Sequence, residues 1–321
     1  MLAFGAHRSY SEPRQDQPVP TFDPQTLRMR SIVIASAVLL ISSALGAQQL
    51  PRAIDTDPPH DTLHPARLEV LHIPSGGVKI VGMAYVPAGA GVHPTLVIFH
   101  GLPGMEKNLD LAQAVRRAGW NAITVNYRGS WGSPGVFRFG NNLEDAAAVL
   151  AFLRDSATIR SLAVDTSRLV VAGHSMGGWV AALTAAHDHA VRGAVLISMA
   201  DMGRVGTISR SEATQLSAAN MESLAGVTPE SMADDLLGGA ARWRVGDRAE
   251  ALARTPLLVL TSNDGLAPHS DALVKLVRAR GNERVTTVHA PTDHSWSDKR
   301  VMLESEVIRW LQQLDGRRSA R

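Results

Sequence analysis

The sequence feature that most constrains the fold is the stretch Arg168–Gly178, which reads RLVVAGHSMGG. It begins as an apolar, β-branched run typical of a buried strand, and it is followed by Trp179–His187, which is compatible with a helix. A serine at so tight a turn has a strained backbone and tolerates only small residues two positions before and after it. Gly173 and Gly177 stand at those positions. The pattern therefore predicts a strand, a sharp turn and a helix, with Ser175 at the apex.

The helix that follows Ser175 points free N–H groups and the positive end of its dipole at the serine, where an oxyanion would develop in acyl transfer. A five-residue motif also recurs by chance, and a serine in a turn often only caps a helix. The strand before the motif and the helix after it are the context that the nucleophile elbow requires. We therefore interpret Ser175 as a candidate nucleophile.

The amino-acid composition excludes several kinds of functional site. The chain has 321 residues, of which 45% are hydrophobic and 19% are charged, and it contains no cysteine. We expect a globular protein with one α/β domain, and disulfides, cysteine metal sites and a thiol nucleophile are excluded. The net charge is only +2, with a basic tail at residues 317–321. No basic stripe with interleaved aromatic residues occurs elsewhere, so we expect no nucleic-acid partner.

Residues 1–47 are predicted to be a leader and signal peptide. The basic start Arg28-Met29-Arg30 precedes an apolar centre, and small residues end the segment at Gly46-Ala47. The first 28 residues are an unusual preface, so we hypothesise that translation starts at Met29. This segment predicts a secreted or periplasmic protein. The alternative is an uncleaved segment that anchors the protein in a membrane.

After a polar, proline-rich linker at residues 48–67, strand and helix patterns alternate up to residue 316. The first two strands are joined by Ser75-Gly76-Gly77, which is a hairpin signal. This order predicts an α/β fold with a mainly parallel sheet, opened by an antiparallel hairpin and covered by helices on both faces. The predicted strands are 68–73, 78–86, 95–99, 121–127, 168–174, 193–198, 256–261 and 285–289.

Residues 201–253 interrupt this alternation with polar helical pieces and no good strand. We expect a helical insertion that forms a lid over the carboxyl ends of the strands. A long disordered loop is the alternative, but Met232 and Trp243 need a place to be buried. Elsewhere, a helix over residues 143–154 is predicted to begin with Asn142 as its N-cap.

A serine hydroxyl needs a base, and the base needs an orienting acid. Asp264 and His294 each stand in a loop after a predicted strand, and the order Ser, Asp, His is that of nucleophile-elbow hydrolases. We interpret them with Ser175 as a catalytic triad. The alternatives are that Asp264 only starts a turn, and that His269 or His289 is the base.

The oxyanion hole needs two N–H donors, and we assign them to Met176, after the nucleophile, and Leu102, in the loop after the third strand. Trp131, Phe137 and Trp179 are candidates to line an acyl pocket, although each could equally be plain packing. His100 is interpreted as a structural histidine that holds its loop.

No metal or organic cofactor is implied. His60 and His64 lie in a proline-broken linker, and His187 and His189 are two residues apart, so they do not share a helix face.

Several motifs together resemble the α/β-hydrolase superfamily over roughly residues 68–314, and they are His100–Gly104, Asn126–Ser130, Gly173–Gly178, Asp264 and Asp293-His294. The Tyr-Arg-Gly-Ser loop and the Gly-Gly after the elbow are similar to the catalytic domains of prolyl oligopeptidases and to dienelactone-hydrolase-like and acyl-esterase-like members. The resemblance implies the α/β-hydrolase fold and a serine mechanism, and it identifies no substrate.

Prolyl-oligopeptidase relatives usually carry a β-propeller before the hydrolase domain, whereas here about twenty residues separate the predicted signal peptide from the first strand. We therefore expect a serine hydrolase that cleaves small carboxylic ester or acyl substrates, with specificity set by residues 130–140 and 201–253. A peptidase or amidase with the same triad and a catalytically silent binding protein are the alternatives.

Overall fold

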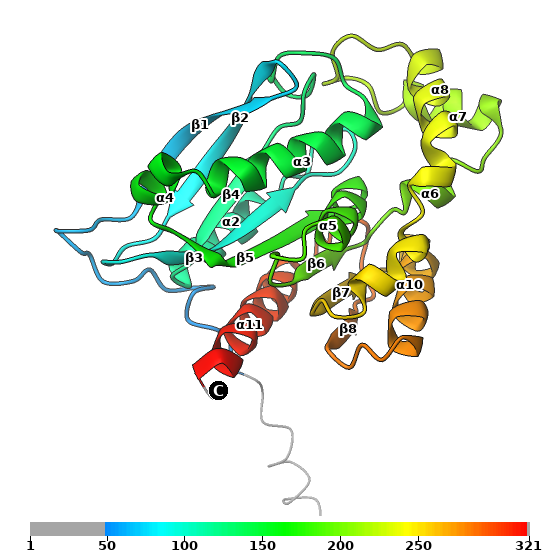
Figure 1. Cartoon of the computed structure of the whole chain (residues 1–321). Coiled ribbons are helices and arrows are strands. Elements are labelled where there is room, and N and C mark those ends of the chain that lie inside the picture. The colour runs from blue at the N-terminus through cyan, green and yellow to red at the C-terminus, as the bar shows by residue number, and fades with distance from the viewer. Residues whose placement is uncertain (1–48, 320–321) are drawn as a thin grey trace, which may run out of the picture. The chain divides into compact units, whose positions relative to one another are not determined.

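The computed structural model describes residues 49–319, with side chains up to residue 316. The predicted signal peptide and the start at Met29 lie outside the described residues. The core of the structure is one sheet of eight strands in the order β1-β2-β4-β3-β5-β6-β7-β8 (Figure 1). The strands are β1 (Arg67–Ser75), β2 (Val78–Val86), β3 (His93–Phe99), β4 (Asn121–Val125), β5 (Val164–His174), β6 (Ala194–Ile197), β7 (Leu257–Thr261) and β8 (Val285–His289).

The sheet is antiparallel only at one edge. β1 pairs with β2 and β2 with β4 in antiparallel fashion, and every other pairing is parallel. The hairpin turn consists of Gly76 and Gly77, whose φ angles of 53° and 81° are in the left-handed region that glycine adopts without strain. The predicted mainly parallel sheet with an opening hairpin is therefore confirmed.

Helices cover both faces of the sheet, and the central strands alternate between two cores. In β3, Val97 and Phe99 contribute to the core under the helices α3 and α5, whereas Leu96 and Ile98 contribute to the core under α2 and α11. A strand buried on both faces reads as a continuous apolar run, because its side chains point alternately to the two faces. The helices outside the insertion are α2 (Leu109–Arg117), α3 (Phe139–Leu153), α4 (Ser156–Leu162), α5 (Met176–His187), α10 (Ala267–Ala279) and α11 (Arg300–Ser319).

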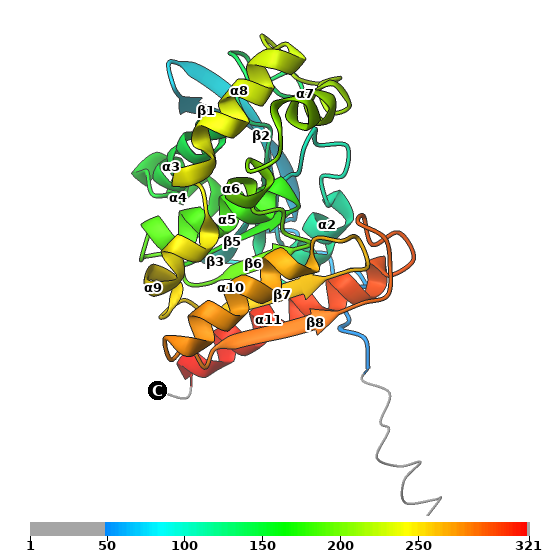
Figure 2. The ribbon, with the colours of Figure 1, turned by 90° about the vertical axis from the view of Figure 1, so that its right-hand side faces the viewer.

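The insertion at residues 201–253 is helical, and Figure 2 shows its helices α6 to α9 beside the sheet. Its helices are α6 (Met202–Val205), α7 (Arg210–Ala218), α8 (Pro229–Gly239), η1 (Ala240–Arg242), η2 (Val245–Arg248) and α9 (Ala249–Leu252). α7 and α8 each begin with a capping box, in which the N-cap side chain and the third helical residue bond each other's backbone. Met232 and Trp243 are buried, as the interpretation of a packed insertion requires.

The predicted start of α3 is wrong. The helix begins at Phe139, and Asn142 lies buried inside it with its side-chain amide 3.4 Å from the sulfur of Met176. The backbone N–H of Phe139 is instead bonded by the carboxylate of Asp235 from α8, at 2.7 Å. A carboxylate at a helix N-terminus satisfies a free amide and complements the dipole, but here it comes from a segment far along the chain.

The predicted linker, described from residue 49, is partly buried. Ala53 is buried against Ala114 and Ile308 of α2 and α11, and Arg117 donates a 2.6 Å hydrogen bond to the carbonyl of Ala53. No helix within residues 49–319 is both long and apolar enough to cross a membrane.

Candidate active site

The carboxyl ends of the parallel strands meet at one edge of the sheet. Phe99 of β3 is in register with Gly173 of β5, and Thr261 of β7 with His289 of β8. The loops that follow these strands therefore leave the sheet on the same side, which in open α/β sheets is where ligands bind. These are the loops that carry Leu102, Ser175, Asp264 and His294.

The backbone at Ser175 has the strained geometry expected of a nucleophile elbow. Its φ and ψ are 56° and −121°, which is unusual for a residue other than glycine. A Cβ at Gly173 would lie 1.9 Å from the carbonyl oxygen of Gly177, and one at Gly177 would lie 2.1 Å from that of Phe99. The two glycines are therefore required by steric contact, as predicted from the sequence.

Asp264 and His294 form a hydrogen-bonded pair beside this elbow. The Nδ1 of His294 is 2.7 Å from Oδ2 of Asp264, and the side chains are 38% and 3% exposed. Burial by itself would raise the pKa of Asp264, but hydrogen bonds from His294 and from the amide of Leu266 offset it, so this pKa lies below its usual value. Asp264 is thus held ionised, with His294 as its partner and its other oxygen starting the turn at Leu266.

His174 connects the serine to the histidine loop, and sequence reasoning overlooked it. Its Nε2 donates a 2.8 Å hydrogen bond to the carbonyl of His294, and the two rings lie 4.5 Å apart. Burial, followed by the neighbouring His294, lowers the pKa of His174 to about 4, so it is neutral at physiological pH. Because Ser175 is the next residue, this bond fixes the His294 loop against the elbow. In the sequence, His174 is the variable residue between Gly173 and Ser175, and the Gly-x-Ser motif assigns no role to that position.

The two predicted oxyanion donors come from separate elements beside Ser175. Met176 is the first residue of α5, and its N–H has no acceptor within its own helix. Gly101 lies so close that a Cβ there would be 3.0 Å from the Cβ of Ser175, and Leu102 follows it directly. The structure therefore brings the Leu102 loop against the elbow.

His100 anchors this loop. Its Nδ1 donates a 2.7 Å bond to the carbonyl of Gly101, and its ring packs against that of Tyr127 at a tilt of 58°, with the ring centres 4.6 Å apart. Burial lowers the pKa of His100 to about 4, so the ring is neutral. A neutral, enclosed ring of this kind fits the structural role predicted for it.

The alternative bases have other partners, and so does the neighbouring Asp293. His289 contacts Thr261 and Asn263, and the Nδ1 of His269 accepts the N–H of Asp201. Asp293 accepts the backbone N–H of Ser297 in its own loop. Among the residues that the structure describes, no cluster of three or more His, Asp or Glu side chains is arranged to hold a metal ion.

The three aromatic residues predicted to line a pocket differ in position. Trp179 and Phe137 are buried in the core, where Trp179 donates to the carbonyl of Trp243 and Phe137 packs edge-on against Phe139. Both side chains therefore pack in the core, which was the alternative to lining an acyl pocket. Trp131 instead lines a pocket of about 530 Å³.

This pocket joins three segments of the chain. The indole Nε1 of Trp131 and the hydroxyl of Ser223 both donate to the carbonyl of Pro103, at 2.7 and 3.0 Å. Pro103 directly follows Leu102, and Ser223 belongs to the insertion. The loop after β4 and the insertion therefore both hold the segment that carries a predicted oxyanion donor.

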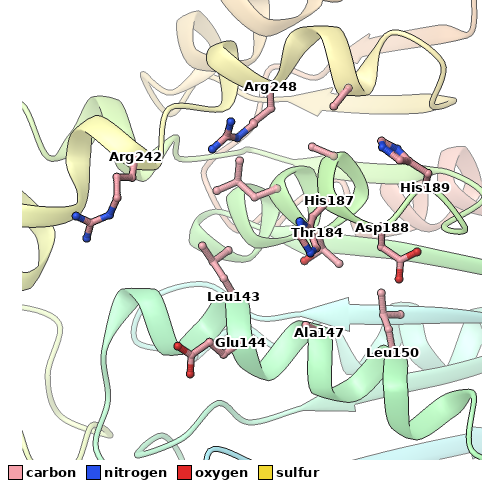
Figure 3. Close-up of a pocket in the computed structure, with 13 residues that line it drawn as sticks. Leu143, Glu144, Ala147, Leu150, Thr184, His187, Asp188, His189, Arg242 and Arg248 are labelled. Atoms are coloured by element: carbon pink, nitrogen blue, oxygen red, sulfur yellow. The ribbon is translucent and has the colours of Figure 1, made fainter.

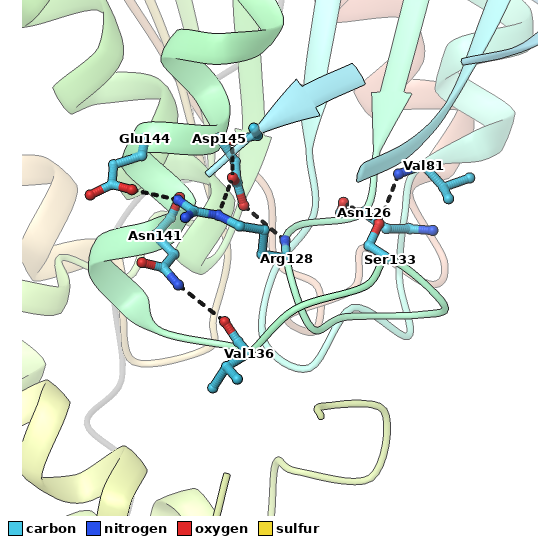
Figure 4. A network of polar contacts seen from close by, with 9 residues as sticks. Val81, Asn126, Arg128, Ser133, Val136, Asn141, Glu144 and Asp145 are labelled. Carbon is cyan, nitrogen blue, oxygen red and sulfur yellow. Dashed lines mark hydrogen bonds and ion pairs between the residues drawn. The ribbon is translucent and has the colours of Figure 1, made fainter. Parts of the chain in front are cut away.

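A buried ion pair shapes the loop that presents Trp131, as Figure 4 shows. Arg128 donates through Nε to Asp145 and through a terminal nitrogen to Glu144, both at 2.6 Å, while Asp145 also accepts the N–H of Arg128 and the hydroxyl of Ser75. Asp145 and Glu144 stand on α3, and Arg128 stands in the loop. The pair fixes the first turn of the loop against the helix.

Comparisons with known proteins agree with this geometry. Residues 96–318 match the family described as "Alpha/beta hydrolase family". The comparison with curated proteins finds no match.

Solved structures share the fold at low sequence identity. A hyperthermophilic esterase from the archaeon Pyrobaculum calidifontis is 22% identical with a TM-score of 0.56, and the match covers 82% of this chain and 88% of that chain. Est1E from Butyrivibrio proteoclasticus with bound ferulic acid is 18% identical with a TM-score of 0.60, over 77% and 99%. An acylaminoacyl peptidase from Pyrococcus horikoshii is 16% identical with a TM-score of 0.60, over 77% of this chain and 41% of that chain.

Proposed function

Since the chain belongs to the alpha/beta hydrolase family, we propose that it cleaves carboxylic esters through a serine mechanism. The observation that carries the proposal is the 2.7 Å bond between His294 and the buried Asp264, at the sheet edge where Ser175 occupies a strained elbow. An acid, an imidazole and a strained serine on three loops of one edge form the arrangement that activates a hydroxyl.

The hydroxyl of Ser175 attacks the acyl carbon, and His294 accepts its proton. Asp264 keeps Nδ1 of the imidazole protonated, so Nε2 is the basic nitrogen, and it stabilises the imidazolium that forms. The N–H groups of Leu102 and Met176 hold the oxyanion. His294 then returns the proton to the leaving alcohol, which departs and leaves an acyl-enzyme. Water, activated by His294, releases the acid and restores the serine.

The pocket beside Trp131 supports a small substrate. At about 530 Å³ it has the size of a small-molecule site, and it borders the segment after Leu102. The lining of this pocket is apolar at Met105, Leu224 and the indole of Trp131. Glu222 also lines it. We assign one side of the ester, acyl or alcohol, to this pocket.

Two measurements test the proposal. Purified protein is assayed with p-nitrophenyl acetate, butyrate and octanoate and with aminoacyl p-nitroanilides, and Ser175 is labelled with a fluorophosphonate probe. We expect ester turnover, labelling of the folded wild type and neither in Ser175→Ala. Faster turnover of the anilides would assign a peptidase or amidase with the same residues. Failure to label the folded protein would favour a catalytically silent binding protein.

We also propose that the protein is exported, because residues 28–47 have the order of a signal peptide, basic then apolar then small. N-terminal sequencing of the native protein tests this proposal. A new N-terminus after Gly46 or Ala47 is expected, and a retained segment would indicate a membrane anchor.

A further inference from the structure

A second pocket lies at the far end of α5 from Ser175. It has a volume of about 910 Å³ and is lined by α3, the last turns of α5, and the segment of η1, η2 and α9 (Figure 3). α5 has 12 residues, so with a rise of about 1.5 Å per residue its last turn lies about 17 Å from the elbow. The second pocket also shares no lining residue with the pocket beside Trp131, so the two pockets are separate.

The floor of this pocket is aliphatic. Leu143, Ala147 and Leu150 form a stripe along one side of α3 at spacings of four and three (Figure 3), and Leu183 of α5 also lines the pocket. A floor of this kind accommodates a hydrocarbon chain, because contact removes apolar surface from water.

The charged side chains that line the pocket differ in whether they have an ion-pair partner. Its two carboxylates already have partners outside the lining, since Glu144 is 2.6 Å from Arg128 and Asp188 is 2.5 Å from Arg154. The pocket also has two arginines, Arg242 and Arg248. Their side chains are exposed and form no hydrogen bond or ion pair within the described residues. The charge of Arg242 also acts on Asp235, so the cation left fully unmatched is Arg248, which Figure 3 shows reaching over the pocket from above.

A buried hydroxyl at the pocket also has no partner. Thr184 is 8% exposed, and its Oγ1 has no hydrogen-bond partner among the described residues. Figure 3 shows Thr184 beside His187 on the side of α5 that lines the pocket. A buried polar atom is costly unless it is bonded, so a ligand oxygen that displaces a lining side chain to reach this enclosed hydroxyl would satisfy it.

We propose that this pocket binds a small organic carboxylate with an aliphatic chain. The carboxylate lies between the guanidinium of Arg248 and the hydroxyl of Thr184, and the chain lies along the aliphatic stripe of α3. Arginine binds carboxylates through two parallel N–H donors, which suits a headgroup, and the aliphatic floor favours a ligand that carries a chain over one without it. This site is independent of the ester chemistry at Ser175.

Isothermal titration of the full-length protein with octanoate tests the proposal, with acetate and octanol as matched ligands that lack the chain or the charge. We expect saturable binding of octanoate and at least tenfold weaker binding of acetate and octanol. Arg248→Gln is expected to weaken octanoate at least tenfold, and Thr184→Val severalfold. Ala147→Phe fills the pocket from an exposed position on α3 and is expected to abolish binding.

Lys79→Gln is the control, because it removes an exposed cation from the β1–β2 hairpin and should change nothing. Octanoate also resembles an ester product, so binding that survives both Ala147→Phe and Arg248→Gln belongs to another site and overturns the proposal. The absence of octanoate binding, or equal binding of octanol, overturns it as well. If Ala147→Phe fails to fold, Arg248→Gln alone decides, because the Arg248 side chain is exposed and has no hydrogen bond or ion pair within the described residues.

Discussion

Two of the pairs between a basic side chain and a carboxylate differ in exposure in a way that separates their roles. Arg128 and Asp145 are 9% and 0% exposed, whereas His294 and Asp264 are 38% and 3% exposed. In the first pair both charges are enclosed, and Asp145 has bonds from a backbone N–H and from Ser75 as well. In the second pair only the acid is enclosed, and the imidazole is open to solvent on one side.

The difference indicates what each pair can do. An enclosed arginine remains charged and cannot exchange protons, so Arg128 fixes the position of a loop. A half-exposed imidazole on a fixed carboxylate can gain and lose a proton while keeping its orientation. We therefore expect the stability of the fold to depend on Arg128 and Asp145, and the activity to depend on His294 and Asp264.

The largest effect is expected for His294→Ala. Ester turnover should fall on the order of 10⁶-fold, as loss of a triad base typically does, because Ser175 then has no proton acceptor. Asp264 keeps its bond from the amide of Leu266 but loses its side-chain donor, so we expect the free energy of unfolding to fall by about 1–3 kcal/mol. The measurements are kcat with a p-nitrophenyl ester and urea unfolding. A loss of folding that accounts for the lost activity would contradict the distinction between the pairs.

Asp264→Asn is expected to lower kcat by about 10⁴-fold with the protein still folded, because an amide in this place favours the wrong imidazole tautomer. Its matched counterpart is Asp293→Asn, which changes an exposed neighbour of the base and should leave kcat within about threefold. A large loss in Asp293→Asn with little change in Asp264→Asn would make Asp293 the acid and Asp264 only the start of a turn.

Arg128→Met is expected to act on stability. It leaves Asp145 charged, buried and without its cation, which costs about 3–5 kcal/mol of unfolding free energy. Urea unfolding monitored by tryptophan fluorescence measures this change. Arg210→Gln is the control, because its ion pair with Asp234 is on the surface, and the unfolding midpoint should stay where it is. A stable Arg128→Met protein with normal kcat would mean that Asp145 is held by its other partners.

The smallest effect concerns pH. Burial, with the neighbouring His294, lowers the pKa of His174 to about 4 from its ordinary 6.5. The unfolded chain therefore binds a proton between pH 6.5 and 4 that the folded chain does not, and stability falls as the pH falls through this range. At pH 5 the loss attributable to His174 is about 2 kcal/mol relative to pH 7.5.

His174→Gln keeps a donor for the carbonyl of His294 but cannot titrate. Its unfolding free energy should change less between pH 7.5 and 5 than that of the wild type. An identical pH dependence in the two proteins would mean that His174 titrates normally when folded.

Much of the fold was predictable because its signals are local. The central strands β3, β4, β6 and β7 were predictable from apolar runs, since a strand buried on both faces needs them, and the hairpin was predictable from Ser75-Gly76-Gly77. The steric need for Gly173 and Gly177 was also local, because the crowding arises within a few residues of Ser175. The order of Ser175, Asp264 and His294 was readable because each follows a strand.

Other features were not predictable, because they depend on contacts across long distances in the chain. The N–H at the start of α3 is bonded by Asp235, 96 residues away. A local pattern cannot indicate such a partner, so the predicted N-cap at Asn142 was wrong. The bond from His174 to the carbonyl of His294 joins residues 120 apart. The burial of Trp179 and Phe137, against the partial exposure of Trp131, likewise depended on packing that no periodicity specifies.

The sequence by itself determined which segments are strands, where the chain turns sharply and which residue types stand after each strand, because these follow from side-chain shape and backbone strain over a few residues. The tertiary structure decided which of these residues meet, which charges are enclosed and which polar atoms are left without partners. Those outcomes depend on burial, and burial is a property of the whole packed chain.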